Sequence, residues 1–277
     1  MINTAATAPR PKLLGYWWAP VMVLAVALAV MAFLQPYQAI GLSELAPQVV
    51  ESASELDKAL GAPVKGAFKY SIRRSYLSPT GPMEVEIRVT LQPIGHGLVM
   101  REDEWYEIKG RNVVYQERFI LFRNLFALHT RSRERAPFVH DVMGRIGWYT
   151  DSVQSFKSKL EGATPESPSW QLNVTTDRMS NIDGKGLLQQ STPYQRDLHC
   201  EYSGELAGPE VGAAFKGSYP KISCRSSASN QPAERRSEYA YLPEHGIFLL
   251  LSYQQQTGPS AEKLAVNGNY VSFEALP

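Results

Sequence analysis

The chain has 277 residues, of which 44% are hydrophobic and 20% are charged, so it is too apolar for an intrinsically disordered protein. Its 28 basic and 27 acidic residues give a net charge of +1, which lacks the basic excess of nucleic-acid-binding proteins and excludes nucleic acid as an expected partner. Two cysteines are too few, without histidines, for a four-ligand zinc site.

The N-terminal segment predicts a membrane anchor. No charged residue occurs between Lys12 and Glu44, and residues 13–35 within this gap are apolar enough and long enough to cross a hydrocarbon core of about 30 Å. We therefore expect a tail at residues 1–12, a transmembrane signal-anchor helix at 13–35 and a spacer at 36–46.

The residues around this segment predict its orientation. Arg10 and Lys12 precede it, while the first charged residues after it are acidic, so the positive-inside rule places the N-terminus in the cytoplasm. We predict a single-pass protein of the cell inner membrane with the bulk of the chain in the periplasm. The alternative is a cleaved signal peptide with its apolar core at 21–34. Amphipathic rings gather at membrane interfaces, and three are expected there: Trp17, Trp18 and Tyr37.

Residues 47–161 are expected to hold a short helix, a β-meander and a long helix. The short helix at 47–60 is indicated by apolar residues at three- and four-residue steps, namely Val49, Ala53, Leu56 and Leu60. Pro47 suits its first turn and Gly61 its end. Strict alternation then predicts a half-buried strand through Met83, Val85, Ile87, Val89 and Leu91.

The middle of the chain gives one hairpin, one ambiguous run and one long helix. Residues 105–108 and 113–122 are expected to pair as a hairpin. The apolar run 119–128 suits a buried strand or a buried helix equally. Residues 138–160 are predicted as a long amphipathic helix because their apolar residues form one stripe: Val139, Val142, Met143, Ile146, Tyr149, Val153, Phe156 and Leu160.

A second antiparallel β region is expected at 170–277, after a linker rich in glycine, proline and serine at 162–169. The alternative is that residues 47–277 form one domain. Strands are expected at 170–174, 194–202, 213–224, 238–242 and 247–253, with a loop at 226–235.

Cys200 and Cys224 each fall in one of these strands, which predicts a disulfide that joins the two strands. A structural disulfide is the usual state of paired cysteines in an oxidising compartment. Two alternatives stay open, namely two free buried thiols or a metal site that includes the neighbouring His199.

The candidate catalytic residues are weak. Two segments have the S-x-x-K spacing of penicillin-binding proteins, Ser218 to Lys221 and Ser260 to Lys263, but the accompanying K-T-G element is missing. His140 and Asp141 are adjacent on the predicted long helix. Their side chains would therefore point about 100° apart, which suits a helix terminus better than an acid–base pair.

The remaining polar candidates have structural explanations. His96 and His245 lie beside glycines, which predicts turn roles rather than metal ligation. His129 precedes an arginine cluster that suits a solvated edge strand, or contact with anionic lipid headgroups as the alternative. Asn173 begins a glycosylation sequon, which matters only in a eukaryotic secretory route.

Three tryptophans are expected in the core: Trp105, Trp148 and Trp170. The alternative is that they line an apolar cavity, between the sheet and the long helix, for a lipid or another apolar ligand.

These observations predict an α+β protein: a transmembrane helix followed by an exported, β-rich domain with two antiparallel regions and a long amphipathic helix between them. No enzymatic motif, cofactor site or metal site is predicted. The expected function is an accessory, scaffold or assembly protein of an inner-membrane or envelope complex, with protein partners there. The alternatives are a lipid-binding or apolar-ligand-binding module, and an envelope hydrolase with an unrecognised site.

Overall fold

The computed structural model describes residues 40–78, 81–107, 113–134, 148–162, 164–184, 188–255, 264–267 and 269–276. Residues Ile40–Pro277 form one compact unit. Its helical elements are η1 (Leu42–Glu44), α2 (Pro47–Leu60) and α3 (Gly208–Val211). Its strands are β1 (Ala67–Ser78), β2 (Gly81–Gly95), β3 (Leu98–Glu107), β4 (Val113–Phe122), β5 (Phe126–Glu134), β6 (Trp148–Glu161), β7 (Gln171–Gly184), β8 (Leu188–Ala207), β9 (Ser218–Ala228), β10 (Gln231–Leu242), β11 (Ile247–Gln255), β12 (Leu264–Asn267) and β13 (Asn269–Leu276).

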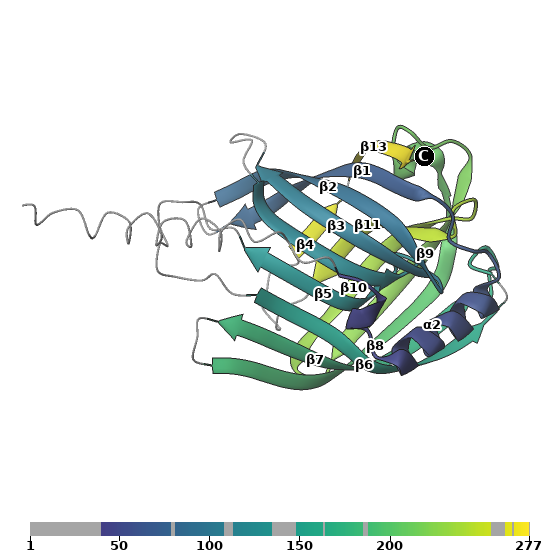
Figure 1. Ribbon diagram of the computed structural model, residues 1–277. Coiled ribbons are helices and arrows are strands. Elements are labelled where there is room, and N and C mark those ends of the chain that lie inside the picture. The colour runs from purple at the N-terminus through teal and green to yellow at the C-terminus, as the bar shows by residue number, and fades with distance from the viewer. Residues whose placement is uncertain are drawn as a thin grey trace, which may run out of the picture. The chain divides into compact units, whose positions relative to one another are not determined.

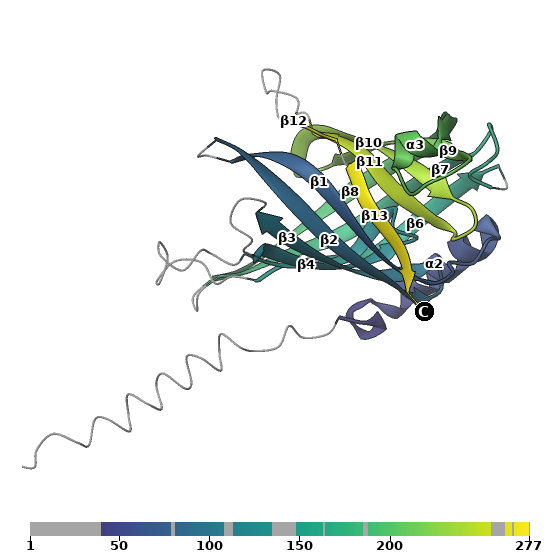
Figure 2. The ribbon, with the colours of Figure 1, turned by 90° about the horizontal axis from the view of Figure 1, so that it is seen from above.

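The strands form one 13-stranded antiparallel sheet in which β1 to β11 each pair with the next strand along the chain (Figure 1). The last two strands lie at opposite edges, because β12 pairs with β11 whereas β13 pairs with β1. Figure 2 shows β13 beside β1, with β11 and β12 close by. The consecutive strands β12 and β13 therefore link the two edges, and the sheet curls around an interior.

The predicted α+β class with a long amphipathic helix is wrong, because the described chain is nearly all β. Residues 148–160, predicted as part of that helix, lie in strand β6 (Trp148–Glu161). The pairing of β6 with β7 shifts register between Val153 and Ser155, and such a bulge adds one residue to a strand with a period of two. Apolar residues before and after the bulge consequently fall at steps of four, three and four residues, namely Tyr149, Val153, Phe156 and Leu160.

Helix α2 confirms its prediction in bounds and in orientation. It begins at Pro47, it ends before Gly61 with φ of 76°, and it buries the four predicted apolar residues, Val49, Ala53, Leu56 and Leu60. Strand β6 pairs with β5 only as far as Ser152, and α2 lies against β6 (Figure 1). The Gln48 side chain donates to the backbone oxygen of Gln154 at 3.0 Å, so α2 covers part of the β6 edge.

Two apolar clusters hold the sheet together, and the β10–β11 hairpin belongs to both. Tyr241 and Phe248 pack with the buried face of α2, whereas Leu242 and Leu249 pack with β1 and β2. Both faces of this hairpin are therefore buried, which explains its near-continuous apolar sequence. The alternation predicted for β2 is confirmed, because one face of the strand is buried in the second of these clusters, through Val85, Ile87, Val89 and Leu91.

The other strand predictions are confirmed with two exceptions, and the first is the strand expected at 213–224, which begins only at Ser218 because residues 213–217 form a turn and irregular chain. β3 and β4 pair as expected, and the ambiguous run 119–128 forms the end of β4, a turn and the start of β5. The expected loop at 226–235 is wrong, because β9 continues to Ala228 and β10 begins at Gln231. Proline in the segment suggested a loop, but strands tolerate proline where no ladder hydrogen bond is required.

The predicted tail, anchor and most of the spacer, together with Trp17, Trp18 and Tyr37, lie outside the described residues. Within the part of the chain that the structure describes, no helix is long and apolar enough to cross a membrane.

Candidate functional site

The interior of the curled sheet contains a cavity of about 240 Å³. Strands β3 to β5 and β7 to β11 contribute its walls, together with the turn between β4 and β5. Its apolar wall is formed by Leu121, Leu125, Phe126, Ala127, Val174, Leu198 and Leu250. Its polar wall contains four arginines, Arg101, Arg178, Arg196 and Arg235, with Asn124, Thr176, Ser226, Ser237, Tyr239 and Tyr253.

Arg178 is held rigidly against the cavity by Asp151. Their side chains are 2% and 8% exposed, and the Nη2 to Oδ2 distance is 2.8 Å. Arg178 Nη1 donates to the backbone oxygen of Ala127 at 2.8 Å, and the hydroxyl of Tyr194 donates to Asp151 Oδ2 at 2.8 Å. Burial raises the pKa of Tyr194, so its hydroxyl keeps its proton at neutral pH. Arg178 Nε also donates to Asp151, so all three nitrogens of the guanidinium are engaged, but of its five N–H donors one on each Nη remains.

Arg101 is paired in the same way on the neighbouring part of the wall. Both of its bonds to Asp103, from Nε and from Nη2, measure 2.6 Å, and Asp103 is buried. Burial alone would lower the pKa of Arg101, but the charge and hydrogen bonds of Asp103, together with Tyr70 and Tyr270, raise it overall. Arg101 also donates to Asn124 Oδ1 at 3.3 Å, and Asn124 donates to the backbone oxygen of Phe248 at 2.8 Å.

Arg196 on β8 differs from these two arginines because no described carboxylate lies within ion-pair distance of its guanidinium. Asp151 acts on it only from farther away and is already bonded to Arg178 and Tyr194. The Arg196 Cζ lies 5.7 Å from the centre of the Tyr194 ring. Burial lowers the pKa of Arg196, and the charges of Arg178 and Arg235 lower it further. An arginine nevertheless stays protonated at physiological pH, so the cavity wall carries a charge without a direct counter-charge.

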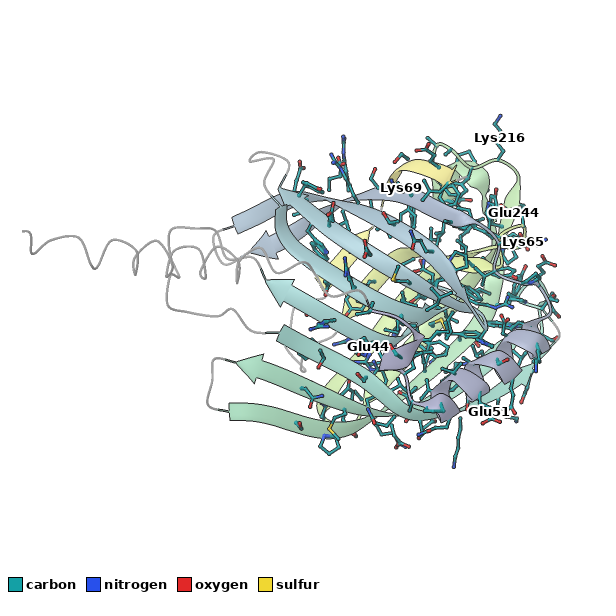
Figure 3. All side chains as sticks on the ribbon, viewed as in Figure 1. Glu44, Glu51, Lys65, Lys69, Lys216 and Glu244 are labelled. Carbon is teal, nitrogen blue, oxygen red and sulfur yellow. A yellow bond between two sulfur atoms is a disulfide. The ribbon has the colours of Figure 1, made fainter. Side chains whose placement is uncertain are left out.

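Charged residues on the outside show a different pattern, because they are exposed and mix both signs. Figure 3 labels six of them: Glu44, Glu51, Lys65, Lys69, Lys216 and Glu244. These six exposed positions carry three negative and three positive charges. The cavity lining, in contrast, contains arginines and no aspartate or glutamate.

The β4–β5 turn and α2 contact each other at one end of the curled sheet. Arg123 and Asn124 in this turn have φ of 46° and 61°, an uncommon region for residues other than glycine. The Arg123 side chain is fully buried and contacts Asp57 of α2 at 2.6 Å. A side chain at Gly97, in the β2–β3 turn, would collide with Asp57. These contacts fix the turn that positions Asn124, Leu125 and the start of β5 at the cavity.

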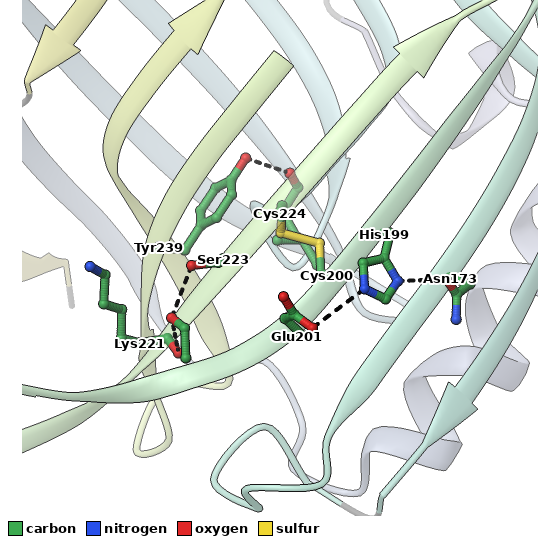
Figure 4. Close-up of a disulfide and its surroundings, with 10 residues drawn as sticks. Asn173, His199, Cys200, Glu201, Lys221, Ser223, Cys224 and Tyr239 are labelled. Atoms are coloured by element: carbon green, nitrogen blue, oxygen red, sulfur yellow. Dashed lines mark hydrogen bonds and ion pairs between the residues drawn. A yellow bond between two sulfur atoms is a disulfide. The ribbon is translucent and has the colours of Figure 1, made fainter. Parts of the chain in front are cut away.

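The predicted disulfide is confirmed. Cys200 and Cys224 face each other across β8 and β9, and both are buried (Figure 4). The alternatives of free thiols and of a metal site with His199 are thereby excluded for these cysteines. His199 instead contacts Asn173, the predicted sequon residue, with 2.7 Å between Nδ1 and Oδ1 (Figure 4). Among the described residues no group of three potential metal ligands occurs.

The S-x-x-K candidate on β9 does not form a catalytic pair. Residues three apart on a strand point to opposite faces. Ser218 donates to Glu205 at 2.7 Å, and Lys221 contacts Glu238 at 2.8 Å. The second such pair, Ser260 and Lys263, lies outside the described residues, as do His140 and Asp141.

The histidine predictions have mixed outcomes. His96 has φ of 56° in the β2–β3 turn and His245 lies in the β10–β11 turn, so the predicted turn positions are confirmed. The edge strand expected for the arginines after His129 is wrong, because β5 pairs with both β4 and β6. His129 itself is buried, and its Nδ1 lies 2.8 Å from the Ser152 hydroxyl. Its Nε2 has no hydrogen-bond partner among the described residues. A serine nucleophile needs a histidine oriented by a third group, so this pair lacks part of a catalytic triad.

The tryptophans line the core rather than a cavity next to a long helix. Trp170 is fully buried and its ring centre lies 6.1 Å from that of Phe248. Trp105 packs against the apolar cluster that contains Leu242 and Leu249. The side chain of Trp148 lies outside the part of the chain that is described. The cavity exists, but its walls are arginines, leucines and hydroxyls, which the sequence analysis missed.

A signal for these arginines was present in the alternation of the strands. Arg178 follows Leu172 and Val174 on the same face of β7, and Arg196 precedes Leu198 and Cys200 on the same face of β8. A charged residue at an apolar position of a strand indicates a buried polar site. The spacing alone does not say which strands face each other across the interior.

The fold and the site define a class: an antiparallel, nearly all-β protein that curls around a small cavity lined by arginines and leucines. No protein-family model, curated protein or solved structure matches the chain.

Proposed function

We propose that this protein is a non-enzymatic binding protein that holds a small ligand inside its curled sheet. The observation that carries the proposal is the cavity of about 240 Å³ whose wall combines apolar side chains with fixed polar groups. Small-molecule sites have this mixture, in which apolar surface provides contact and a few polar groups orient the ligand. Of the three functions expected from the sequence, the cavity favours a module that binds an apolar ligand over an accessory scaffold and over a hydrolase.

The volume limits the ligand to a small molecule. Water occupies roughly 30 Å³ per molecule in the liquid, so the cavity is equivalent to about eight waters. Pockets for drug-sized ligands span roughly 300 to 1,000 Å³, which is larger. A complete phospholipid is therefore excluded as the enclosed ligand, whereas a compact molecule of about ten non-hydrogen atoms fits.

We also propose that the domain works outside the cytoplasm. The buried disulfide between Cys200 and Cys224 supports this location, because disulfides persist in oxidising compartments. The membrane anchor at 13–35 and protein partners in the envelope stay predictions from the sequence.

The test is a thermal-shift screen of the purified full-length chain against small compounds that combine an apolar body with one polar group. A ligand specific for the folded state raises stability by about 2.7 kcal/mol at a concentration of 100 Kd. We expect at least one such compound to raise Tm, and the effect to be lost in Ala127→Leu, which fills the cavity.

The matched control is Ala213→Leu, because Ala213 is exposed and lies outside the cavity lining. This variant should respond to ligands as the natural chain does. A screen without any shift, or equal shifts in the natural chain and in Ala127→Leu, would contradict the proposal.

A further inference from the structure

The charge of the cavity wall indicates the chemical class of the ligand. Four arginines and no carboxylates line the cavity. Asp103 and Asp151 compensate Arg101 and Arg178 at 2.6 Å and 2.8 Å, respectively. The described residues supply no such partner for Arg196. The wall therefore keeps an excess of positive charge that faces the cavity.

Arg196 is placed unfavourably unless an anion joins it. Its guanidinium lies in the field of Arg178 and of Arg235, and like charges in a poorly solvated site repel each other strongly. Arg196 is half-buried, and a partly desolvated charge without a counter-charge is costly until an opposite charge enters. The planar guanidinium also offers paired N–H donors whose geometry matches a carboxylate.

The neighbouring polar groups are preorganised to assist. Arg178 is fixed on its far side by Asp151 and by the backbone oxygen of Ala127, which leaves part of its guanidinium unused. Thr176, directly across from Arg196 in the β7–β8 register, also lines the cavity. The apolar part of the wall includes Leu121 and Leu250.

We propose that Arg196 anchors the anionic group of the ligand, and that the ligand is a small monoanion with an apolar body, such as a short-chain carboxylate. This inference rests on the proposed ligand-binding function and names its ligand class. The carboxylate lies between Arg196 and the unused face of Arg178, and the apolar body lies against the leucines. A neutral molecule of the same shape leaves the charge of Arg196 uncompensated and binds more weakly.

The experiment is calorimetric titration of the full-length chain with hexanoate and with hexanamide, which share a shape and differ in charge. Hydrogen bonds to charged groups contribute about 1.5 to 3 kcal/mol, so we expect hexanoate to bind roughly tenfold more tightly or better. In Arg196→Gln this preference should disappear through weaker hexanoate binding alone. Arg196→Lys keeps the charge without the paired donors, so it should retain a reduced preference.

The matched control is Arg236→Gln. Arg236 lies next to Arg235 on β10, its side chain is 65% exposed, and it pairs with Glu234 outside the cavity lining. It should bind both probes as the natural chain does. A second readout is independent of ligand: Arg196→Gln removes an uncompensated charge, so its Tm without ligand should equal or exceed that of the natural chain. A lower Tm would identify a structural ion pair at Arg196 and would overturn the inference.

The outcomes separate this inference from the proposed function. Equal binding of hexanoate and hexanamide, unchanged in Arg196→Gln, would overturn the anion anchor while leaving a ligand-binding cavity. Binding of inorganic phosphate alone, dependent on Arg196, would overturn the apolar body of the ligand class. Binding of none of the three probes would count against the anchor, and the compound screen would decide separately on the cavity.

Discussion

Arg123 is fully buried, and the carboxylate of Asp57 is the acid that compensates it at 2.6 Å. The pair joins α2 to the β4–β5 turn, so it holds together two elements that are 66 residues apart in the chain. Removing one partner of a buried pair leaves the other charge without compensation. The contact between α2 and the β4–β5 turn therefore depends on Asp57.

We predict that Asp57→Asn lowers the free energy of unfolding by about 3 kcal/mol, since breaking buried pairs costs roughly 3 to 5 kcal/mol and Asp57 is partly exposed. Urea denaturation followed by circular dichroism measures this difference. The control is Glu55→Gln, an exposed position on the same helix, which should change stability by no more than about 0.5 kcal/mol. Equal stability of the two variants would show that the pair contributes nothing.

His129 gives a prediction for pH dependence. Burial lowers its pKa below the ordinary histidine value of about 6.5, so the unfolded chain takes up a proton first as pH falls. Its stabilising contribution is therefore complete above the unfolded-state pKa and is lost as pH falls through and below that value. Glu44, Arg131, Asp151 and Arg178 are the charged groups that act on it.

We expect the loss of unfolding free energy between pH 7.5 and pH 5.5 to be smaller in His129→Asn than in the natural chain. His245, whose pKa burial also lowers, contributes in the same direction in both proteins. Ser152→Ala retains the histidine and should retain the full pH dependence. Identical pH dependence in the natural chain and in His129→Asn would refute this assignment.

At the scale of elements, the disulfide joins two long central strands. The cysteines are 24 residues apart and their strands are already paired, so the bridge acts mainly by restricting the unfolded chain. We predict that denaturation under reducing conditions lowers the free energy of unfolding by about 3 kcal/mol relative to oxidising conditions. The double variant Cys200→Ala with Cys224→Ala should not respond to the reductant. Equal stability of the natural chain in both conditions would contradict a stabilising role.

Elements whose signals are local were predictable from the sequence. α2 was predicted residue by residue because its proline start, its glycine end and its apolar period all lie within the helix. β2 was predictable because its alternation is uninterrupted. β6 was not, since the bulge after Val153 changes a strand period into the spacing of a helix. A bulge depends on the partner strand, which a single segment does not specify.

The candidate site depended on the whole molecule and could not be derived in the same way. Arg101, Arg178 and Arg196 occupy inward positions of separate strands, and they meet only because the sheet curls until β13 reaches β1. The sequence marks each of them as a charge at an apolar position. Their common cavity follows from the order of all the strands, which local patterns do not encode.

The most direct test of the account is a crystal structure of the full-length chain with 6-bromohexanoate, whose bromine is located by its anomalous scattering. The account predicts one strong bromine peak inside the cavity, near Leu121 and Leu250, with the carboxylate in contact with Arg196. An empty cavity at saturating ligand, or a carboxylate turned away from Arg196, would contradict it.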